Sequence, residues 1–316
     1  MDRVSLTDVT LREYGQNVPT PYLHVFTPEI RIEIARELIH AGLCRMELLS
    51  CVHPRVAPAM SRERAQKIAA ALGRAQDCEL VTLAPNKAGY RNFLAWGLGP
   101  DGYNHTLGVF FSAVEAHNRL NLGRSIQETM KEYEEIIEDA VARKAKVAGY
   151  VSAAFGYLDD KSGETIRPSP ELLNRLIDFY FDLGAESVTL SDLQGVADEQ
   201  ETAEVFQAVL SKRNRSQAQR IGYHPHHVSA AKAIANSKVA YDAGIRCFDA
   251  SLGGTGGCVT GAPGNQPVDL LVRSFERRRI RTGINGEAVS VLTAFVQREL
   301  FNKIPLVHRP LRNSYR

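Results

Sequence analysis

The stretch Arg220-Ile221-Gly222-Tyr223-His224-Pro225-His226, with the alanine-rich segment 228–243 behind it, decides the fold and points to the chemistry. Residues 220–223 are typical of a short buried strand, and residues 228–243 are typical of a helix. In parallel α/β proteins, active-site residues gather where a strand ends and the next helix begins. Because alternate residues of an extended segment face the same side, His224 and His226 can offer two imidazoles to one divalent ion.

The same succession of strand and helix runs along the whole chain. Apolar runs typical of strands occupy residues 4–9, 45–49, 79–83, 104–111, 146–152, 187–190, 221–226 and 246–250. Amphipathic segments, several of them opened by Thr, Ser, Pro or Asp, occupy residues 28–41, 62–72, 125–143, 170–183 and 198–212. About eight such units without a Pro- or Gly-rich linker predict an α/β fold, a single (β/α)8 TIM barrel over residues 1–285.

An open, doubly wound sheet is the competing fold. It would be expected to carry a phosphate-binding glycine pattern just after the first strand. The turn after residues 4–9 carries Arg12, Glu13 and Gln16 instead, which are side chains suited to chemistry rather than to a close approach of the backbone to phosphate. In a barrel all strand ends open on one face, so that distant parts of the sequence can converge there. The sequence therefore favours the barrel.

Composition narrows the class of protein. The chain has 316 residues, 44% of them hydrophobic, and a formal net charge of +2, which fits one large α/β domain and gives no sign of a nucleic-acid partner. Arg277, Arg278, Arg279 and Arg281 form a basic cluster that fits a solvated helix end better than an anion site. No apolar run reaches membrane-spanning length, and the N-terminus begins almost directly with a strand-like segment, so that we expect a cytoplasmic protein without a membrane partner.

Cysteine usage and the end of the chain add two expectations. The five cysteines are odd in number and lack CxxC spacing, which predicts that most of them are buried thiols and argues against a disulfide framework or a zinc site. Residues 286–316 carry Val289, Leu292, Phe295, Val296 and Leu300 at helical spacing. We therefore expect a C-terminal helical extension that packs on the barrel or on a second subunit, in a homodimer or higher homo-oligomer.

Three stretches together resemble a known family. They are Asp8-Val9-Thr10-Leu11-Arg12-Glu13-Tyr14-Gly15-Gln16, His224-Pro225-His226 and the glycine-rich run 253–265. In order and spacing they resemble the DRE-TIM metallolyases, and the chain up to residue 285 is most similar to the 3-hydroxy-3-methylglutaryl-CoA lyases. The likeness extends to Met46-Glu47-Leu48, Leu83-Ala84-Pro85-Asn86, Gly149-Tyr150-Val151-Ser152 and Leu190-Ser191-Asp192.

The resemblance implies a metal-dependent carbon–carbon lyase. Its substrate would be a 3-hydroxy-3-methylglutaryl-CoA-like β-hydroxy acyl-CoA, cleaved into an acyl-CoA and a 3-oxo acid. A divalent ion, Mg²⁺ or Mn²⁺, would be held by Glu13, His224, His226 and Asn265, a mixture of oxygen and nitrogen donors that suits such ions. Arg12 would compensate the charge that develops on the enolate oxygen of the thioester.

Further residues have candidate roles around this centre. His224 is expected to take part in proton transfer as well as in ligation. Glu47 and Asp192 end strand-like runs and are candidates for orienting Arg12 or a histidine. Asp192 fits the N-cap of a helix equally well. Gln16 is expected to hydrogen-bond the substrate.

Two loop regions complete the candidate site. The glycine-rich run 251–265 predicts a mobile loop that orders over the substrate. In the resembling lyases a cysteine of this loop helps to deliver a proton to the leaving carbanion, which points to Cys258, with Thr255 as the alternative occupant of that position. Asn86, Asn118 and Asn121 are candidates for binding carboxylate or pantetheine groups, and the alternative for each is that it stabilises its own loop.

Two positions depart from the family pattern. Glu13 and His227 each stand where an aspartate is usual, and glutamate at the first position also occurs in homocitrate-synthase-like members, which form carbon–carbon bonds. A Claisen- or aldol-type synthase or aldolase, joining an acyl-CoA or enolate to a 2-oxo acid or aldehyde, is therefore an alternative function. A non-catalytic barrel subunit is a third, and the intact ligand set argues against it.

Overall fold

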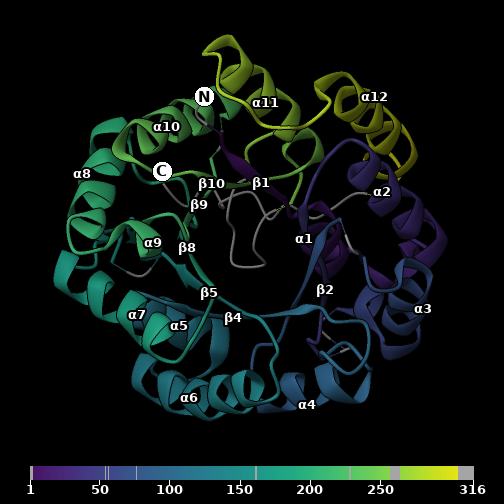
Figure 1. Ribbon diagram of the computed structural model, residues 1–316, viewed down its shortest axis with the longest axis horizontal. Helices are drawn as coiled ribbons and strands as arrows, with labels where there is room; N and C mark the ends of the chain where they lie inside the picture. The colour runs from purple at the N-terminus through teal and green to yellow at the C-terminus, as the bar shows by residue number, and fades with distance from the viewer. Residues whose placement is uncertain are drawn as a thin grey trace.

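The fold is a closed barrel of parallel strands surrounded by helices (Figure 1). The computed structural model describes residues 3–304, except 54, 56, 76, 161, 228 and 257–263. Around the barrel the strands follow the order β1-β10-β9-β8-β5-β4-β3-β2, and the first and last strands pair directly, with Ser5 opposite Cys247 and Asp8 opposite Ala250. This confirms the TIM barrel that the sequence predicts.

The barrel strands overlap the eight strand-like runs of the sequence. They are β1 (Ser5–Asp8), β2 (Arg45–Ser50), β3 (Glu79–Leu83), β4 (Thr106–Ser112), β5 (Val147–Ser152), β8 (Ser187–Asp192), β9 (Ile221–Pro225) and β10 (Cys247–Ala250). A small antiparallel hairpin of β6 (Tyr157–Leu158) and β7 (Thr165–Ile166) follows β5.

Helices connect the strands, and most of them cover the outside of the barrel (Figure 1). They are α1 (Thr10–Asn17), α2 (Pro28–His40), α3 (Arg62–Leu72), α4 (Lys87–Ala95), α5 (Glu115–Leu122), α6 (Ile126–Ala142), α7 (Pro170–Asp182), α8 (Glu199–Leu210), α9 (Arg215–Ala218), α10 (Ala230–Ala243), α11 (Val268–Arg277) and α12 (Gly286–Val296). None of the described helices combines the length and the hydropathy that crossing a membrane requires.

Residues 10–17 form helix α1, whereas the sequence suggested a turn. The Asp8 carboxylate at the end of β1 accepts hydrogen bonds from the backbone N–H of Thr10 at 3.0 Å and from its hydroxyl at 2.8 Å. The Thr10 hydroxyl in turn accepts the N–H of Leu252 at 2.8 Å, just beyond β10. A carboxylate that binds backbone N–H groups at this point favours the start of a helix. Arg12 and Gln16 therefore lie one helical turn apart.

Tyr180 of α7 shows how closely the helices approach the barrel. Its ring stacks on Phe111 of β4, with the ring centroids 4.9 Å apart, and its hydroxyl donates to the carbonyls of Val109 and Tyr150 at 3.3 and 3.2 Å. Gly149 of β5 lies beneath the ring, and a Cβ atom added there would be 2.5 Å from Cγ of Tyr180. The missing side chain at position 149 is therefore what allows α7 to pack against β4 and β5.

The C-terminal segment packs on the barrel beside α1. Helix α12 continues into a π-helical turn at Gln297–Phe301, and the Phe301 ring contacts the buried ring of Tyr14 with the centroids 4.8 Å apart. A helix is thus present in the segment 286–316, where the sequence predicts one. The division of the chain at residue 285 stays a prediction, and residues 305–316 lie outside the described part.

We expect Gly149→Ala to lower the free energy of unfolding by about 1–3 kcal/mol, because the new methyl group would force the Tyr180 ring away from the sheet. Denaturant titration of the variant and of the wild type measures the difference. Gly99→Ala is the control, since the Cβ atom there would meet a methyl group of Leu94 at 3.3 Å and the Phe93 ring at 3.6 Å, without a close overlap. Equal losses in the two variants would contradict this account of how α7 packs.

Candidate active site

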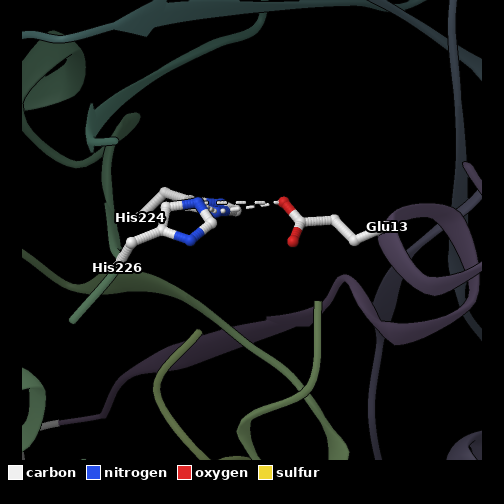
Figure 2. A group of neighbouring side chains, drawn as sticks. All are labelled: Glu13, His224 and His226. Atoms are coloured by element: carbon white, nitrogen blue, oxygen red, sulfur yellow. Dashed lines mark hydrogen bonds and ion pairs between the residues drawn. The ribbon is translucent and has the colours of Figure 1, made fainter. Parts of the chain in front are cut away.

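One carboxylate and two imidazoles meet at the carboxyl ends of the barrel strands (Figure 2). Glu13 lies on α1 just after β1, His224 on β9, and His226 directly after β9. All three are buried, and their possible ligand atoms lie within 4.8 Å of one another. Nε2 of His224 is 3.3 Å from Oε1 of Glu13 and 2.9 Å from Nε2 of His226. Residues more than 200 positions apart in the sequence thus converge as the barrel closes.

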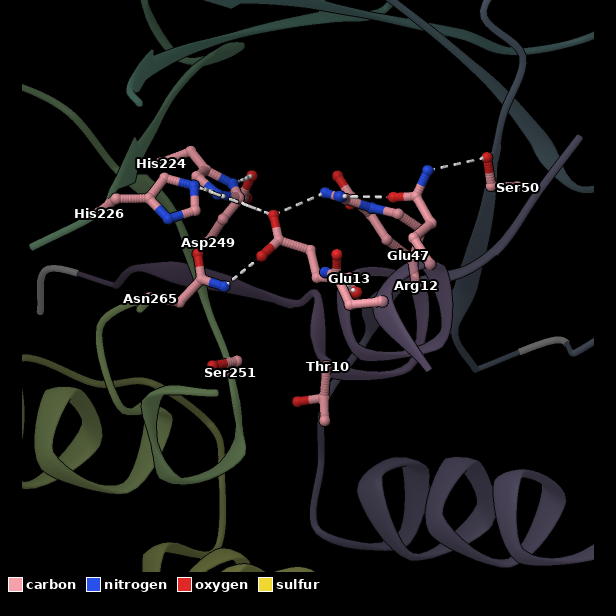
Figure 3. Close-up of polar contacts among 12 residues, drawn as sticks. Thr10, Arg12, Glu13, Glu47, Ser50, His224, His226, Asp249, Ser251 and Asn265 are labelled. Atoms are coloured by element: carbon pink, nitrogen blue, oxygen red, sulfur yellow. Dashed lines mark hydrogen bonds and ion pairs between the residues drawn. The ribbon is translucent and has the colours of Figure 1, made fainter. Parts of the chain in front are cut away.

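The Asp249 carboxylate fixes the ring of His224 through Nδ1, on the side away from Glu13. Its Nδ1 atom lies 3.0 Å from the carboxylate of Asp249 on β10, so that Nε2 is the nitrogen that faces Glu13 and His226 (Figure 3). A carboxylate behind the imidazole is the usual arrangement of a metal-binding histidine, because it fixes the tautomer and makes the ring a better donor. Burial alone would lower the pKa of His224, but the contacts with Asp249 and Glu13 outweigh it and raise that pKa.

Glu13 remains ionised although it is buried. Burial would raise the pKa of its carboxyl group, but the charge of Arg12 and the contacts with His224 and His226 outweigh this effect and hold the pKa well below its usual value. A buried carboxylate that faces two imidazoles is the donor set that a divalent ion requires, and no thiolate lies among the described atoms of the cluster. The residues present therefore fit the metal that the resemblance implies.

Asn265 adjoins this cluster. It pairs with His226 in an antiparallel bridge and donates through its amide nitrogen to Oε2 of Glu13 and to the carbonyl of Thr255. The amide oxygen is left available as a ligand. Gly256 passes directly over the pair, and a Cβ atom there would lie 2.5 Å from Oε2 of Glu13 and 2.6 Å from Nδ2 of Asn265. The space for Glu13 and Asn265 thus depends on the missing side chain at position 256.

Arg12 is fixed between two carboxylates (Figure 3). Its Nε donates to Glu47 at 2.6 Å, a second guanidinium nitrogen lies 3.1 Å from Oε1 of Glu13, and the third donates to Gln16 at 3.2 Å. Gln16 is itself held by the hydroxyl of Ser50, at 3.4 Å. Burial opposes the charge of Arg12, but Glu47 and Glu13 outweigh that opposition and raise its pKa. These contacts therefore fix the position and orientation of the Arg12 guanidinium group beside the cluster.

A cavity of about 450 Å³ opens beside these residues. Of the residues that the sequence singles out, Arg12, Glu13, Gln16, Asn86, Asn121, His224 and His226 line it. Asn86 also begins α4, because its side chain accepts the N–H of Gly89 at 2.8 Å. The barrel mouth thus combines a hollow of substrate size with a possible metal centre at one side.

Asn118 lies elsewhere. Its amide oxygen accepts the N–H of Ser112, and its amide nitrogen donates to the carbonyl of Arg124 and the hydroxyl of Thr129, each at 2.9 Å. It is fully buried and does not line the cavity. Through both its oxygen and its nitrogen, the amide thus ties α5 to the end of β4, to the loop before α6 and to α6 itself, which matches the loop-stabilising alternative.

Asp192 also turns away from the reacting groups. Its carboxylate accepts the N–H groups of Val196 and Ala197, at 3.0 and 3.1 Å, and so holds the loop between β8 and α8. Burial raises the pKa of Asp192 to about 7. The structure does not place it against Arg12 or His224; Glu47 contacts Arg12 and Asp249 contacts His224.

Two further residues complete the comparison with the sequence. Asp249 is not among the residues singled out from the sequence, and the available signal was a single acidic residue inside the otherwise apolar run 246–250. Cys258 lies outside the described residues, and its role stays a prediction. Thr255, the alternative at that position, accepts the amide of Asn265 through its backbone carbonyl.

We expect Gly256→Ala to weaken the binding of Mn²⁺ by about 10–100-fold, as loss of a supporting contact around a metal site commonly does. The added methyl group would displace Glu13 and Asn265. Isothermal titration calorimetry with MnCl₂ measures the affinity. Gly253→Ala is the matched control, because Gly253 also has a positive φ angle of 61° but its Cβ atom would contact Thr293, at 3.4 Å, rather than the cluster. Equal affinities in both variants would argue against a metal at this place.

Comparison with known proteins agrees with this geometry. The chain is 28% identical to the HMG-CoA lyase of Bacillus subtilis, whose crystal structure covers 99% of this chain and 97% of its own with a TM-score of 0.83. The structure of an HMG-CoA lyase from Acinetobacter baumannii in complex with coenzyme A and 3-methylmalate is 26% identical and covers 99% and 96%, with a TM-score of 0.82.

A further relative has a different substrate in its name. The (R)-citramalyl-CoA lyase of Chloroflexus aurantiacus is 29% identical over 96% of this chain and 93% of its own. The sequence model of the HMGL-like family matches residues 3–296, almost the whole described chain. The resemblance drawn from the sequence motifs is confirmed, and the chain belongs to the HMGL-like family.

Proposed function

We propose that this protein is a divalent-metal-dependent carbon–carbon lyase. It cleaves a 3-hydroxy-3-methylglutaryl-CoA-like β-hydroxy acyl-CoA into an acyl-CoA and a 3-oxo acid. The observation that carries this proposal is the cluster of Glu13, His224 and His226 beside a fixed Arg12, at one side of a cavity in a chain of this family. Relatives of similar length and fold are HMG-CoA lyases.

Glu13, His224, His226 and Asn265 are the proposed ligands of the metal. Two carbonyl-type oxygen donors and two imidazoles suit Mg²⁺ or Mn²⁺, which we propose as the ions used. When bound, such an ion lowers the pKa of a hydroxyl group that it coordinates. That chemistry suits a substrate whose cleavage begins with loss of a hydroxyl proton.

The bond changes define what the side chains have to do. The hydroxyl group on C3 loses its proton, the C2–C3 bond breaks, and its electron pair passes to C2 and the thioester carbonyl as an enolate, while C3 becomes a ketone. His224 is the proposed residue for moving the hydroxyl proton. Nε2 can take up this proton only while it is not bound to the metal, and Asp249 at Nδ1 then stabilises the positive charge on the ring. Protonation of C2 then completes the acyl-CoA, and Cys258 is the proposed donor.

Arg12 is the proposed partner of the enolate oxygen. Its guanidinium group is already held by Glu47 and Gln16, so that little reorganisation is needed when negative charge develops. Gln16, Asn86 and Asn121 line the same cavity and are the proposed contacts of the substrate. Glu47 is a positioning residue, because it acts on the substrate only through Arg12.

Within this proposed function, the acyl group of the substrate has still to be identified. A relative of this chain is named for (R)-citramalyl-CoA, which makes that thioester the second candidate substrate. Incubating the Mn²⁺-loaded protein with both thioesters and identifying the fragments by mass spectrometry separates the two. Acetyl-CoA offered together with 2-oxo acids tests the synthase alternative. Condensation without cleavage would replace the lyase proposal, and turnover of no thioester would favour the non-catalytic barrel.

We further propose that the protein forms a homo-oligomer, and its location in the cytoplasm stays a prediction. Two apolar side chains on neighbouring helices support association: Val291 of α12 is 66% exposed and Leu270 of α11 is 40% exposed. Light scattering coupled to size exclusion is expected to give at least twice the mass of 34.9 kDa. A monomer at micromolar concentration would contradict this.

We expect Arg12→Gln to lower kcat by about 100-fold or more while the affinity for Mn²⁺ changes little, because the guanidinium group faces the developing charge and is not a ligand. Steady-state kinetics and calorimetric titration measure the two quantities. Arg143→Gln is the control, since Arg143 pairs with Asp139 on the outer surface of α6. An unchanged kcat for Arg12→Gln would remove Arg12 from the mechanism.

A further inference from the structure

His117 is a buried imidazole in the cavity wall that the mechanism does not use. It lies in the first turn of α5, lines the same cavity as the metal-binding cluster and is fully buried. Both of its ring nitrogens lack a hydrogen-bond partner within the described part of the chain. Its ring contacts the ring of Tyr157, with the centroids 5.1 Å apart, which leaves the two nitrogens unpaired.

Such an arrangement is unusual inside a protein. Buried polar atoms nearly always have a partner, and an unpaired one calls for an explanation in function or in a missing ligand. His105 is also buried, but there one ring nitrogen is satisfied: Nδ1 bonds to the hydroxyl of Thr82 at 2.9 Å, and only Nε2 has no partner among the described residues. A phenylalanine would fill the position of His117 without leaving polar atoms unsatisfied. The histidine therefore points to a partner that arrives with a ligand.

The barrel order places His117 across the mouth from the metal-binding cluster. Glu13 follows β1, His224 belongs to β9, and Asp249 belongs to β10, which stands between these strands. His117 follows β4, the strand four places from β10 in either direction around the barrel. A substrate whose reacting hydroxyl lies at the cluster must extend across the cavity before another part of it reaches His117.

The protonation state of the ring limits what it can bind. Burial lowers the pKa of His117 to about 4, so that the ring is neutral near pH 7 and has one N–H donor and one acceptor nitrogen. A carboxylate or phosphate group only accepts hydrogen bonds and would favour a charged ring. A secondary amide or a hydroxyl group both donates and accepts, and so satisfies a neutral imidazole.

We propose that His117 binds the substrate of the lyase, through a neutral group of the thioester that can both donate and accept a hydrogen bond. This inference rests on the proposed function. Two parts of a substrate can supply such a group: the amides of the pantetheine arm of coenzyme A, and a second hydroxyl group on the acyl portion, additional to the reacting one at the cluster. Either source places His117 among the residues that determine which thioester the protein accepts.

The test compares His117→Phe and His117→Gln with the wild type, each loaded with Mn²⁺. The phenylalanine keeps the ring and removes both polar atoms, whereas the glutamine keeps one donor and one acceptor. We expect kcat/KM for the acyl-CoA to fall about tenfold in His117→Phe, mainly through KM, and to recover in part in His117→Gln. The affinity for Mn²⁺ and the stability toward denaturant should not fall in His117→Phe.

A second substrate separates the two sources. It is the S-methyl thioester of the same acyl group, which has no amide. If His117 binds the pantetheine arm, His117→Phe lowers kcat/KM for the acyl-CoA alone; if His117 binds the acyl portion, it lowers kcat/KM for both thioesters. Unchanged kinetics for both thioesters in a folded, metal-binding His117→Phe would overturn the proposal and leave His117 as part of the wall.

If the protein is not a lyase, the experiment gives a different result. In that case the wild type itself cleaves none of the acyl-CoAs, which can then be titrated by calorimetry without being consumed. A dissociation constant about tenfold higher in His117→Phe than in the wild type would still support His117 as a binding residue. Equal dissociation constants, or no binding to either protein, would overturn that assignment together with the lyase proposal.

Discussion

The buried carboxylate of Glu13 is the interaction on which the rest of the site depends. It contacts the guanidinium group of Arg12, both imidazoles and the amide of Asn265, so that it joins segments from both ends of the chain. Buried charges are costly unless they are compensated. Three carboxylates, those of Glu13, Glu47 and Asp249, surround this centre; Arg12 pairs with the first two, and the charge of Arg45 also acts on Asp249. A divalent cation held by Glu13 and the two imidazoles would add to this compensation.

The fold could be predicted from the sequence because each barrel strand is a short apolar run that a helical pattern follows. Helix α1 could not. Its first turn depends on Asp8 and on Thr10, whose hydroxyl binds the N–H of Leu252, 242 residues away. The close approach of α7 is likewise invisible in the sequence until Gly149 and Tyr180 are seen in contact. Local patterns thus predict which elements exist, whereas contacts between distant residues decide where some of them begin and how closely they pack.

The same distinction explains the candidate site. We could predict from the sequence that Glu13 meets His224 and His226, because all strand ends of a barrel share one face. The hydrogen-bond partners of the acidic residues could not be predicted from the sequence. Asp192 is the last residue of β8 and Asp249 the penultimate residue of β10, yet Asp192 binds backbone N–H groups of its own loop while Asp249 binds His224. Asp249 meets His224 across the neighbouring strands β10 and β9, whereas Asp192 is taken up by the loop that follows it, and neither contact can be read from the local sequence.

The pairing of β1 with β10 has a consequence for how the protein is made. The first strand has no partner on that side until the last one has been synthesised, about 240 residues later at the 5–20 residues per second of a ribosome. The cluster around Glu13 therefore cannot form until His224, His226 and Asn265 have been synthesised. A metal ion that binds only the closed barrel would stabilise the folded state relative to the unfolded state by mass action. Catalytic competence and completion of the chain would then be achieved in the same event.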